Sequence, residues 1–232
     1  MNEAIVLAGG FGTRLREVVS DVPKPMAPVK GRPFLAYILE YLASQNIAKV
    51  ILATGYKHQS IADHFGNHFR DIVLSYSIED TPLGTGGAIR KALAQTTGPH
   101  VYILNGDTFF CVDFLALWKA HQSSAADVTL TLKWRTETDR YGRVLVESNV
   151  VTGFLEKEDG GSGFINGGVY LTHCNLFAGL ALPERFSFEN DFLARHYQQL
   201  RFGVCCAEGF FIDIGIPEDY RRAQTEMGTV HE

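Results

Sequence analysis

The sequence predicts an α/β fold: one Rossmann-like, mixed but mainly parallel sheet, flanked by helices and carrying an inserted β-rich lobe. In the first half of the chain, short apolar runs alternate with amphipathic segments of helical period, a pattern typical of βαβ units. After about residue 133, closely spaced strand and turn patterns indicate antiparallel pairing. No repeat and no Pro- or Ser-rich linker divides the chain. We therefore expect a single domain over residues 1–232.

The composition is that of an ordinary globular protein. The chain has 232 residues, 46% of them hydrophobic, which is enough for one substantial core. A formal charge of -5 and a pI near 5.9 argue against a surface that coats nucleic acid. No run approaches the roughly 18 apolar residues that span a bilayer, and the first residues lack a secretory pattern. We expect a cytoplasmic protein with no nucleic-acid or membrane partner; whether it forms a homo-oligomer stays open.

Cysteine and histidine show no familiar metal-binding pattern. The four cysteines lack C-x-x-C spacing, and the adjacent pair Cys205-Cys206 is poorly placed for a disulfide or a zinc site. His64 and His68 are four residues apart but lack the glutamate of an H-E-x-x-H motif. We expect reduced, buried thiols and eight surface histidines.

The first half is predicted to alternate strands and helices. Residues 20–29 contain three prolines, which forbid a regular helix or central strand there, and Pro33 is placed just inside the next helix. The expected strands lie at 4–8, 49–54, 72–78 and 101–104. The expected helices run from 33 to about 46, from 60 to 65 and from 88 to 95.

The second half is predicted to be richer in strands. Its expected helices are 113–121, a segment containing Phe188 and Phe192, and a last helix opened by Pro217 and ending near Glu226. Its expected strands are 127–133, a hairpin of 141–146 and 150–157 around Ser148-Asn149, then 164–171, 203–207 and 210–213.

A glycine-rich turn, Gly9-Gly10-Phe11-Gly12-Thr13-Arg14, follows the first strand. Residues without a Cβ let backbone N–H groups approach an anion, and the threonine and arginine add side-chain donors. The turn fits neither common phosphate motif: G-x-G-x-x-G would need glycine in place of Leu15, and no G-K-[ST] follows. It predicts a phosphate-binding loop; the alternative is a tight turn whose glycines serve only packing.

Carboxylates end two other predicted strands. Asp107 follows strand 101–104, and Asp213 ends an apolar stretch in which an unpaired carboxylate would be costly. Ligands of an open parallel sheet bind beyond the carboxyl ends of its strands, where the glycine turn and a second cluster, Gly84 to Gly87, also fall. Two carboxylates facing a triphosphate are enough protein ligands to bind Mg²⁺, which takes its other ligands from water and phosphate oxygens. The alternative for each aspartate is a helix cap or turn residue.

Basic residues supply the opposite charge. Arg14 can hold a pyrophosphate through two hydrogen bonds, and Lys24, fixed between two prolines, is a point charge suited to an attacking phosphate. The pair Glu156-Lys157 near the end of the hairpin could hold a sugar phosphate, although the residues alone favour an exposed strand end.

Seven motifs in order, covering nearly the whole chain, resemble those of the sugar-1-phosphate nucleotidylyltransferases. They are Gly9-Gly10-x-Gly12-Thr13-Arg14, Pro23-Lys24-Pro25-Met26, Pro82-Leu83-Gly84-Thr85-Gly86-Gly87, Asn105-Gly106-Asp107, Glu156-Lys157, Asn166-Gly167-Gly168 and Asp213-Ile214-Gly215-x-Pro217. The resemblance implies that a sugar-1-phosphate oxygen attacks the α-phosphorus of a nucleoside triphosphate and releases pyrophosphate.

The resemblance also implies a role for each matching residue. Catalysis falls on Arg14, Lys24, Asp107 and Asp213, and the two aspartates hold Mg²⁺. Residues 1–133 would mainly bind the nucleotide, through Leu7, Ala8, Gly9, Gly10, Gly12, Thr13, Arg14, Glu79, Pro82, Gly84, Thr85 and Asp107. Residues 134–232 would mainly bind the sugar phosphate; the expected contacts over the whole chain are Lys24, Asn105, Gly106, Gly142, Glu156, Lys157, Asn166 and Gly167.

Glu79 bears on the choice of base. A carboxylate can accept from both adjacent donors of guanine, N1–H and the 2-amino group, so a glutamate that reads the base favours GTP; otherwise Glu79 is an exposed residue ending a strand. Among guanylyltransferases, the sequence most resembles those that make GDP-D-glycero-α-D-manno-heptose for bacterial surface polysaccharide. The alternatives are transfer of GMP to mannose 1-phosphate, a uridylyl- or choline-transferring relative, and a non-catalytic regulatory subunit that binds a nucleotide sugar.

Overall fold

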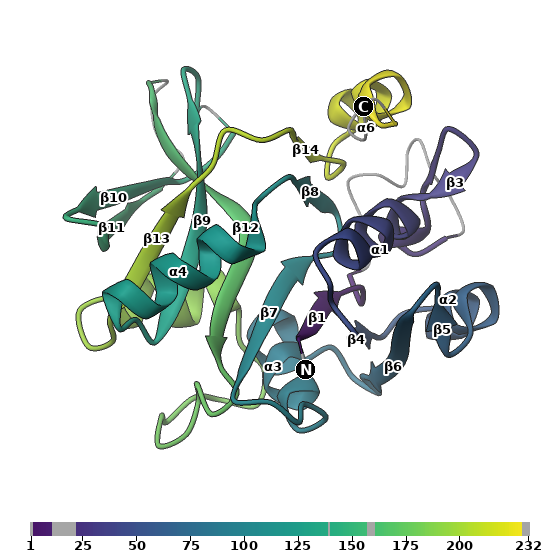
Figure 1. The fold of residues 1–232 in the computed structure, drawn as a ribbon, viewed down its shortest axis with the longest axis horizontal. Helices are drawn as coiled ribbons and strands as arrows, with labels where there is room; N and C mark the ends of the chain where they lie inside the picture. Colours follow the sequence, from purple (N-terminus) through teal and green to yellow (C-terminus); the bar gives the residue numbers. More distant parts are fainter. Residues whose placement is uncertain (1, 11–21, 139, 157–160, 229–232) are drawn as a thin grey trace.

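The structure is a computed structural model that describes residues 2–10, 22–138, 140–156 and 161–228 (Figure 1). One ten-stranded sheet runs through it, in the order β10-β11-β13-β9-β12-β7-β1-β4-β6-β5. Its strands are β1 (Glu3–Leu7), β4 (Lys49–Thr54), β5 (His68–Phe69), β6 (Ile72–Ile78), β7 (His100–Asn105), β9 (Val128–Arg135), β10 (Arg143–Glu147), β11 (Val150–Leu155), β12 (Gly163–His173) and β13 (Phe202–Cys206). The mixed α/β fold predicted from the sequence is confirmed.

The predicted βαβ half is present, since β7, β1, β4 and β6 are parallel neighbours. The β-rich second half continues the same sheet, because β12 pairs antiparallel with both β7 and β9. Beyond β9, strand β13 is parallel to β9, while β10 and β11 form an antiparallel hairpin. The β7–β12 pair is therefore the seam between the two halves of the molecule.

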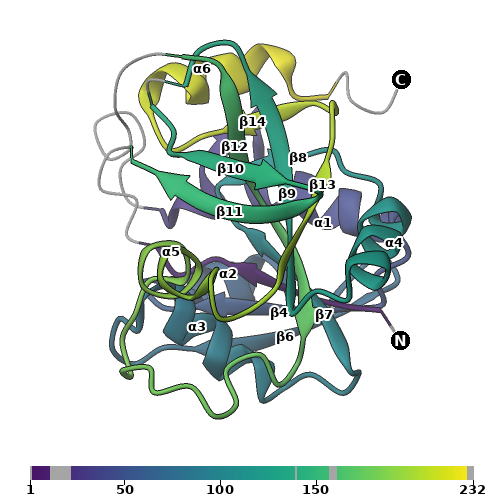
Figure 2. The same cartoon turned by 90° about the vertical axis from the view of Figure 1, so that its left-hand side faces the viewer.

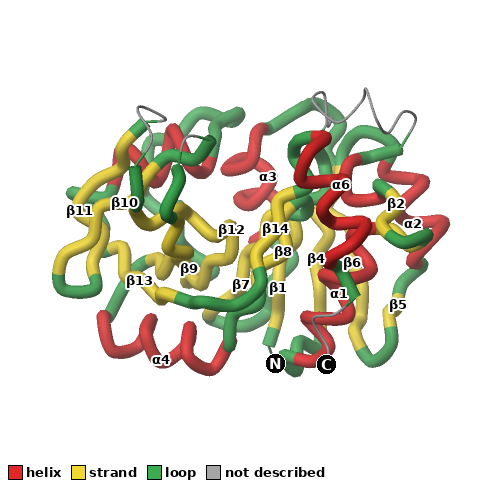
Figure 3. Tube along the Cα trace, turned by 90° about the horizontal axis from the view of Figure 1, so that it is seen from above, coloured by secondary structure: helices red, strands yellow, loops and turns green. Residues whose placement is uncertain are grey.

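Helices cover both faces of the sheet, as the view from above shows (Figure 3). One face carries α1 (Phe34–Ser44), α2 (His58–Phe65), α4 (Phe114–Ser124) and α6 (Pro217–Glu226). The other carries α3 (Gly84–Leu93) and a π-helix (Phe188–Leu193) that continues into α5 (Ala194–His196) (Figure 2). Each face has its own hydrophobic core: Ala4 and Val6 of β1 belong to the first and Ile5 to the second. Both faces of β1 are buried, which explains its unbroken apolar sequence.

Two small antiparallel pairs lie outside the large sheet. A 3₁₀ turn (Lys24–Met26) leads into β2 (Pro28–Val29), which pairs with β3 (Arg32–Pro33). Strand β8 (Thr108–Phe110) pairs with β14 (Phe211–Asp213). The sequence indicated neither β8 nor β5, because runs of two or three residues carry no detectable period.

Helix α3 begins at Gly84, four residues before the predicted start at Ala88. The glycine cluster read as a loop is part of the helix, and it is there for packing: a Cβ on Gly86 would lie 2.1 Å from Cε2 of Phe186. Pro33 was predicted just inside the helix, but it is the last residue of β3 and lies directly before α1. The hairpin turn is confirmed, because Ser148 and Asn149 have φ values of 50° and 62°, the left-handed pair of a type I′ turn.

The histidines are not all surface residues, and that prediction was wrong. Helix α4 packs on the sheet near the seam, so His121 is only 2% exposed and His100 beside it is half-buried, whereas His173 at the end of β12 is exposed. The cysteines are not all buried either, since Cys206 is exposed. Within the described part of the chain, no helix combines the length and the hydropathy needed to cross a bilayer.

Candidate active site

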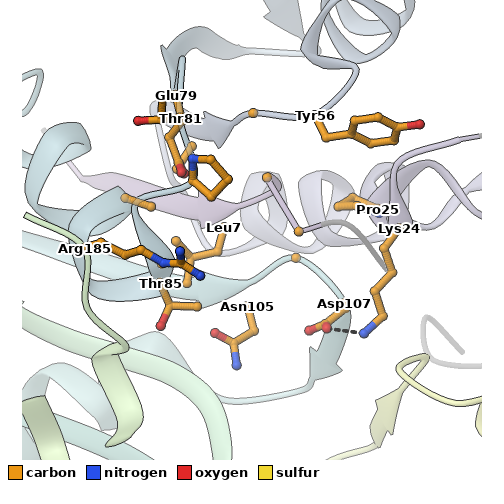
Figure 4. Close-up of a pocket in the computed structure, with 18 of the residues that line it drawn as sticks. Leu7, Lys24, Pro25, Tyr56, Glu79, Thr81, Thr85, Asn105, Asp107 and Arg185 are labelled. Atoms are coloured by element: carbon orange, nitrogen blue, oxygen red, sulfur yellow. Dashed lines mark hydrogen bonds and ion pairs between the residues drawn. The ribbon is translucent and has the colours of Figure 1, made fainter. Parts of the chain in front are cut away.

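A cavity of about 730 Å³ opens where β1, β4, β6 and β7 end (Figure 4). Its volume lies in the range of small-molecule sites. Eleven residues predicted to bind ligands line it: Leu7, Gly9, Gly10, Lys24, Glu79, Pro82, Gly84, Thr85, Asn105, Gly106 and Asp107. Ala8 is fully buried beside the cavity, and its N–H donates to the carbonyl of Ala53 at 2.7 Å. The carboxyl edge of the parallel strands thus gathers these residues, as expected.

The glycines at this edge allow close backbone packing. The N–H of Gly106 donates to the carbonyl of Leu7 at 3.0 Å, and a Cβ on Gly106 would come within 2.2 Å of that same oxygen. A Cβ on Gly9 would lie 3.3 Å from Oε1 of Glu79. In the described part of the glycine turn, Gly9 is closely packed and Gly10 has open space around it, and both line the cavity. Phosphate binding by this turn stays a prediction.

Lys24 and Asp107 form an ion pair at one end of the cavity (Figure 4). Lys24 is held at the start of a 3₁₀ turn, flanked by Pro23 and Pro25. Its side chain is 15% exposed, against 34% for that of Asp107. The ammonium group also reaches the turn after β14, because a Cβ on Gly215 would lie 3.0 Å from Nζ.

Asp213 completes this cluster through the small β8–β14 pair. Asp213 is opposite Thr108 in the register, and the N–H of Ile214 donates to the carbonyl of Asp107 at 2.9 Å. The carboxylate accepts a 2.7 Å hydrogen bond from the N–H of Gly215. Two aspartates more than a hundred positions apart in the sequence thus become neighbours, with Lys24 beside both.

Burial and the nearby charge of Asp107 raise the pKa of Asp213 to about 6, although Lys24 and the Gly215 hydrogen bond oppose the rise. One lysine does not fully compensate two carboxylates in a partly desolvated place. Oxygen ligands from one or two carboxylates are what Mg²⁺ takes from proteins before filling its shell with water and phosphate oxygens. The donor set of Asp107 and Asp213 therefore fits a divalent cation.

Glu79 lies at the opposite end of the cavity, at the carboxyl end of β6 (Figure 4). Its N–H donates to the carbonyl of Thr54 at 2.7 Å, and its Oε2 accepts from the N–H of Leu83 at 2.8 Å. Burial raises the pKa of Glu79, while the Leu83 hydrogen bond and the charge of Lys91 oppose that rise. The carboxylate is thus fixed between the glycine turn and the start of α3, and it is half-buried rather than an exposed strand end.

Thr85 and Arg185 line the cavity between these two ends (Figure 4). The Thr85 hydroxyl donates to Glu189 at 2.8 Å and accepts from the N–H of Phe188 at 2.8 Å, so it fastens α3 to the π-helix. Sequence reasoning missed Arg185 and Glu189, which come from the loop and the π-helix that pack on α3. Only the packing of residues 184–189 against α3 brings them to the cavity, so the sequence assigned neither of them a role in the site.

The described residues of the second half that were predicted to bind the sugar phosphate do not line the cavity. Asn166 donates to the Tyr170 hydroxyl at 2.7 Å and accepts from the N–H of Gly168 at 3.0 Å. This segment borders the site, because a Cβ on Gly168 would lie 2.9 Å from Nδ2 of Asn105. Gly167 packs against Phe110, Gly142 precedes β10, and Glu156 is exposed after β11. The sugar contacts stay predictions, and Gly12, Thr13, Arg14 and Lys157 lie outside the described residues.

The fold is that of a nucleotidyltransferase. Residues 3–229 match the family model described as nucleotidyl transferase, and the chain belongs to this family. A D-glycero-α-D-manno-heptose 1-phosphate guanylyltransferase of Aneurinibacillus thermoaerophilus is 51% identical over 97% of this chain and 98% of its own. One of Campylobacter jejuni subsp. jejuni is 47% identical over 94% of this chain and 96% of its own. The structure of HddC from Yersinia pseudotuberculosis, complexed with GMP-PN, is similar with a TM-score of 0.85 and 35% identity, covering 97% and 98% of the two chains.

Proposed function

We propose that this protein transfers GMP from GTP to D-glycero-α-D-manno-heptose 1-phosphate, forming GDP-D-glycero-α-D-manno-heptose and pyrophosphate. The observation that carries the proposal is the arrangement of Lys24, Asp107 and Asp213 at one end of a nucleotide-sized cavity that has Glu79 at the other. The two relatives named as heptose 1-phosphate guanylyltransferases support the choice of both substrates, since they match over nearly their whole length.

The reaction needs no protein nucleophile. An oxygen of the sugar phosphate forms a bond to the α-phosphorus of GTP, and the bond from that phosphorus to the bridging oxygen breaks, so pyrophosphate leaves with the electron pair. Two anions must be brought together, and catalysis is then mainly positioning and charge neutralisation. Lys24, which lines the cavity, would place a positive charge between them.

Lys24 has donors for more than one partner. In the structure its ammonium group pairs with Asp107, and its remaining N–H donors can serve a phosphate. Mg²⁺ held by Asp107 and Asp213 would supply charge neutralisation at the phosphate oxygens. Lys24 would face the attacking phosphate, and Arg14 is proposed to hold the leaving pyrophosphate.

The experiment that tests the proposed function measures pyrophosphate release with Mg²⁺, across the four ribonucleoside triphosphates and a panel of sugar 1-phosphates. The expected result is the highest kcat/KM with GTP and the heptose 1-phosphate. A preference for mannose 1-phosphate or for UTP would replace the substrate assignment by one of the alternatives. Absence of release with every pair would contradict the enzymatic function.

The Glu79→Gln variant tests how the base is read. Glutamine keeps an oxygen that can accept from Leu83, so the turn is preserved, but it replaces one acceptor by a donor toward the two donors of guanine. A hydrogen bond to a charged group contributes about 1.5–3 kcal/mol, so the ratio of kcat/KM values for GTP and UTP should fall roughly tenfold to a hundredfold. The ratio is measured with one sugar phosphate; an unchanged ratio would remove Glu79 from base recognition.

A further inference from the structure

Three histidines that are far apart in the sequence meet at one place in the fold. His100 begins β7 and His173 ends β12, and the two are direct partners in the antiparallel register of these strands. His121 comes from the last turn of α4, which lies over this part of the sheet. One ring nitrogen of each histidine lies within 4.8 Å of the others.

The buried His121 has one ring nitrogen without a hydrogen-bond partner among the described residues. His121 is 2% exposed, and its Nδ1 is hydrogen-bonded to the Thr129 hydroxyl at 2.9 Å. Its Nε2 is buried and has no hydrogen-bond partner among the described residues, and the same is true of Nε2 of His100. Unpaired buried nitrogens cost free energy, so two in one cluster point to a missing partner.

We propose that His100, His121 and His173 form a second metal site, which binds one transition-metal ion such as Zn²⁺. Imidazole suits Zn²⁺, Ni²⁺ and Cu²⁺, whereas Mg²⁺ takes oxygen ligands. The Thr129 hydrogen bond fixes the ring of His121 in the way that outer-shell partners orient metal ligands. Burial, together with the neighbouring histidines, lowers the pKa of His121 to about 4, so its ring is in the neutral form that binds metals.

The three histidine side chains need to move only a short distance toward one another to bind an ion, because their nitrogens already lie within 4.8 Å of one another. Tetrahedral zinc with Zn–N bonds of 2.0–2.1 Å places its nitrogen ligands about 3.4 Å apart. The rings are already close, with centroids 4.1 Å apart for His100 and His173 and 5.4 Å apart for His100 and His121. His100 is half-buried and His173 is exposed at the end of β12, so an ion can reach the cluster from the His173 side.

This site is separate from the cavity. His100 and Asn105 are the two ends of β7, about 16 Å apart at 3.3 Å per residue, and Asn105 lines the cavity. The ion would join α4 to the β7–β12 seam, so its effect would be on stability. The proposal does not depend on the proposed function.

The test uses the full-length protein after removal of metals with a chelator, in a buffer that contains millimolar Mg²⁺ to occupy the carboxylates. Isothermal titration with ZnCl₂ should give one site per chain, and Zn²⁺ should raise the thermal unfolding temperature. Co²⁺ should give the absorption of a four-coordinate nitrogen site. His173→Ala should weaken Zn²⁺ binding by at least about a hundredfold, more than losing an outer-shell partner does.

The matched controls are His68→Ala, which removes an exposed histidine, and Cys206→Ser, which removes an exposed thiol. Both should keep the single site. His173→Ala should unfold at the metal-free wild-type temperature but lose the increase with Zn²⁺, which separates a ligand from a residue needed only for folding. Absence of stoichiometric binding by the folded wild type, or unchanged binding by the His100→Ala/His173→Ala double variant, would overturn the proposal.

Discussion

Replacing Lys24 by alanine is expected to lower kcat/KM for nucleotidyl transfer about a thousandfold, equivalent to roughly 4 kcal/mol of transition-state stabilisation. Lys24 pairs with Asp107 in the cavity. In the proposed reaction, its charge would be needed where two anionic reactants approach. The pyrophosphate-release assay measures the loss. Because the interaction strengthens as the reactants meet, most of the loss should appear in kcat.

The Lys24 variant should also be less stable at neutral pH. Its removal leaves Asp107 and Asp213 without the cation that lowers the pKa of Asp213. Circular dichroism and thermal unfolding at pH 5 and pH 8 separate this effect from the loss of catalysis. Lys119→Ala, which removes an exposed lysine from α4, is the matched control and should have wild-type activity. A Lys24→Ala protein with wild-type kcat would contradict the role given to this residue.

Asp213→Asn is expected to lower activity at least a hundredfold and, in the absence of divalent cations, to make the protein more stable at pH 8. The pKa of the Asp213 carboxyl is raised from 3.8 to about 6, so the folded state binds a proton more tightly than the unfolded state. Ionised Asp213 therefore destabilises the wild type above about pH 6, and this penalty disappears as the pH falls toward 4. Its size is at most about 3 kcal/mol, the difference between 3.8 and about 6 at 1.36 kcal/mol per pKa unit.

The measurement is the free energy of unfolding of wild type and Asp213→Asn at pH 4, 6 and 8, with EDTA and with Mg²⁺. The variant should gain most at pH 8 with EDTA, and Mg²⁺ should stabilise the wild type more than the variant. Asp71→Asn, at an exposed aspartate, is the control and should show neither effect. A variant that is less stable than the wild type at pH 8 without metal would refute the assignment of a destabilising buried carboxylate.

The longer helices and strands were predicted well because the spacing of their apolar residues can be seen within a short stretch of sequence. The apolar run of β4 and the proline-opened helix α6 have the predicted bounds, and the turn at Ser148-Asn149 closes the predicted hairpin. Helix α3 was predicted four residues short, since glycine is a poor helix former and the sequence does not reveal that Phe186 packs against Gly86.

By itself, the sequence determined the parallel half of the sheet, the edge at which the cavity lies and eleven of the residues that line it. Each of those features depends on a strand and on the turn directly after it. Residues that are adjacent in the sequence are adjacent in space in any fold. Only the tertiary structure decided which distant residues meet. The β8–β14 pair brings Asp213 to Asp107, the packing on α3 brings Arg185 to the cavity, and the register of β7 against β12 sets His100 beside His173. Those contacts depend on strand register and helix packing, which no local pattern specifies.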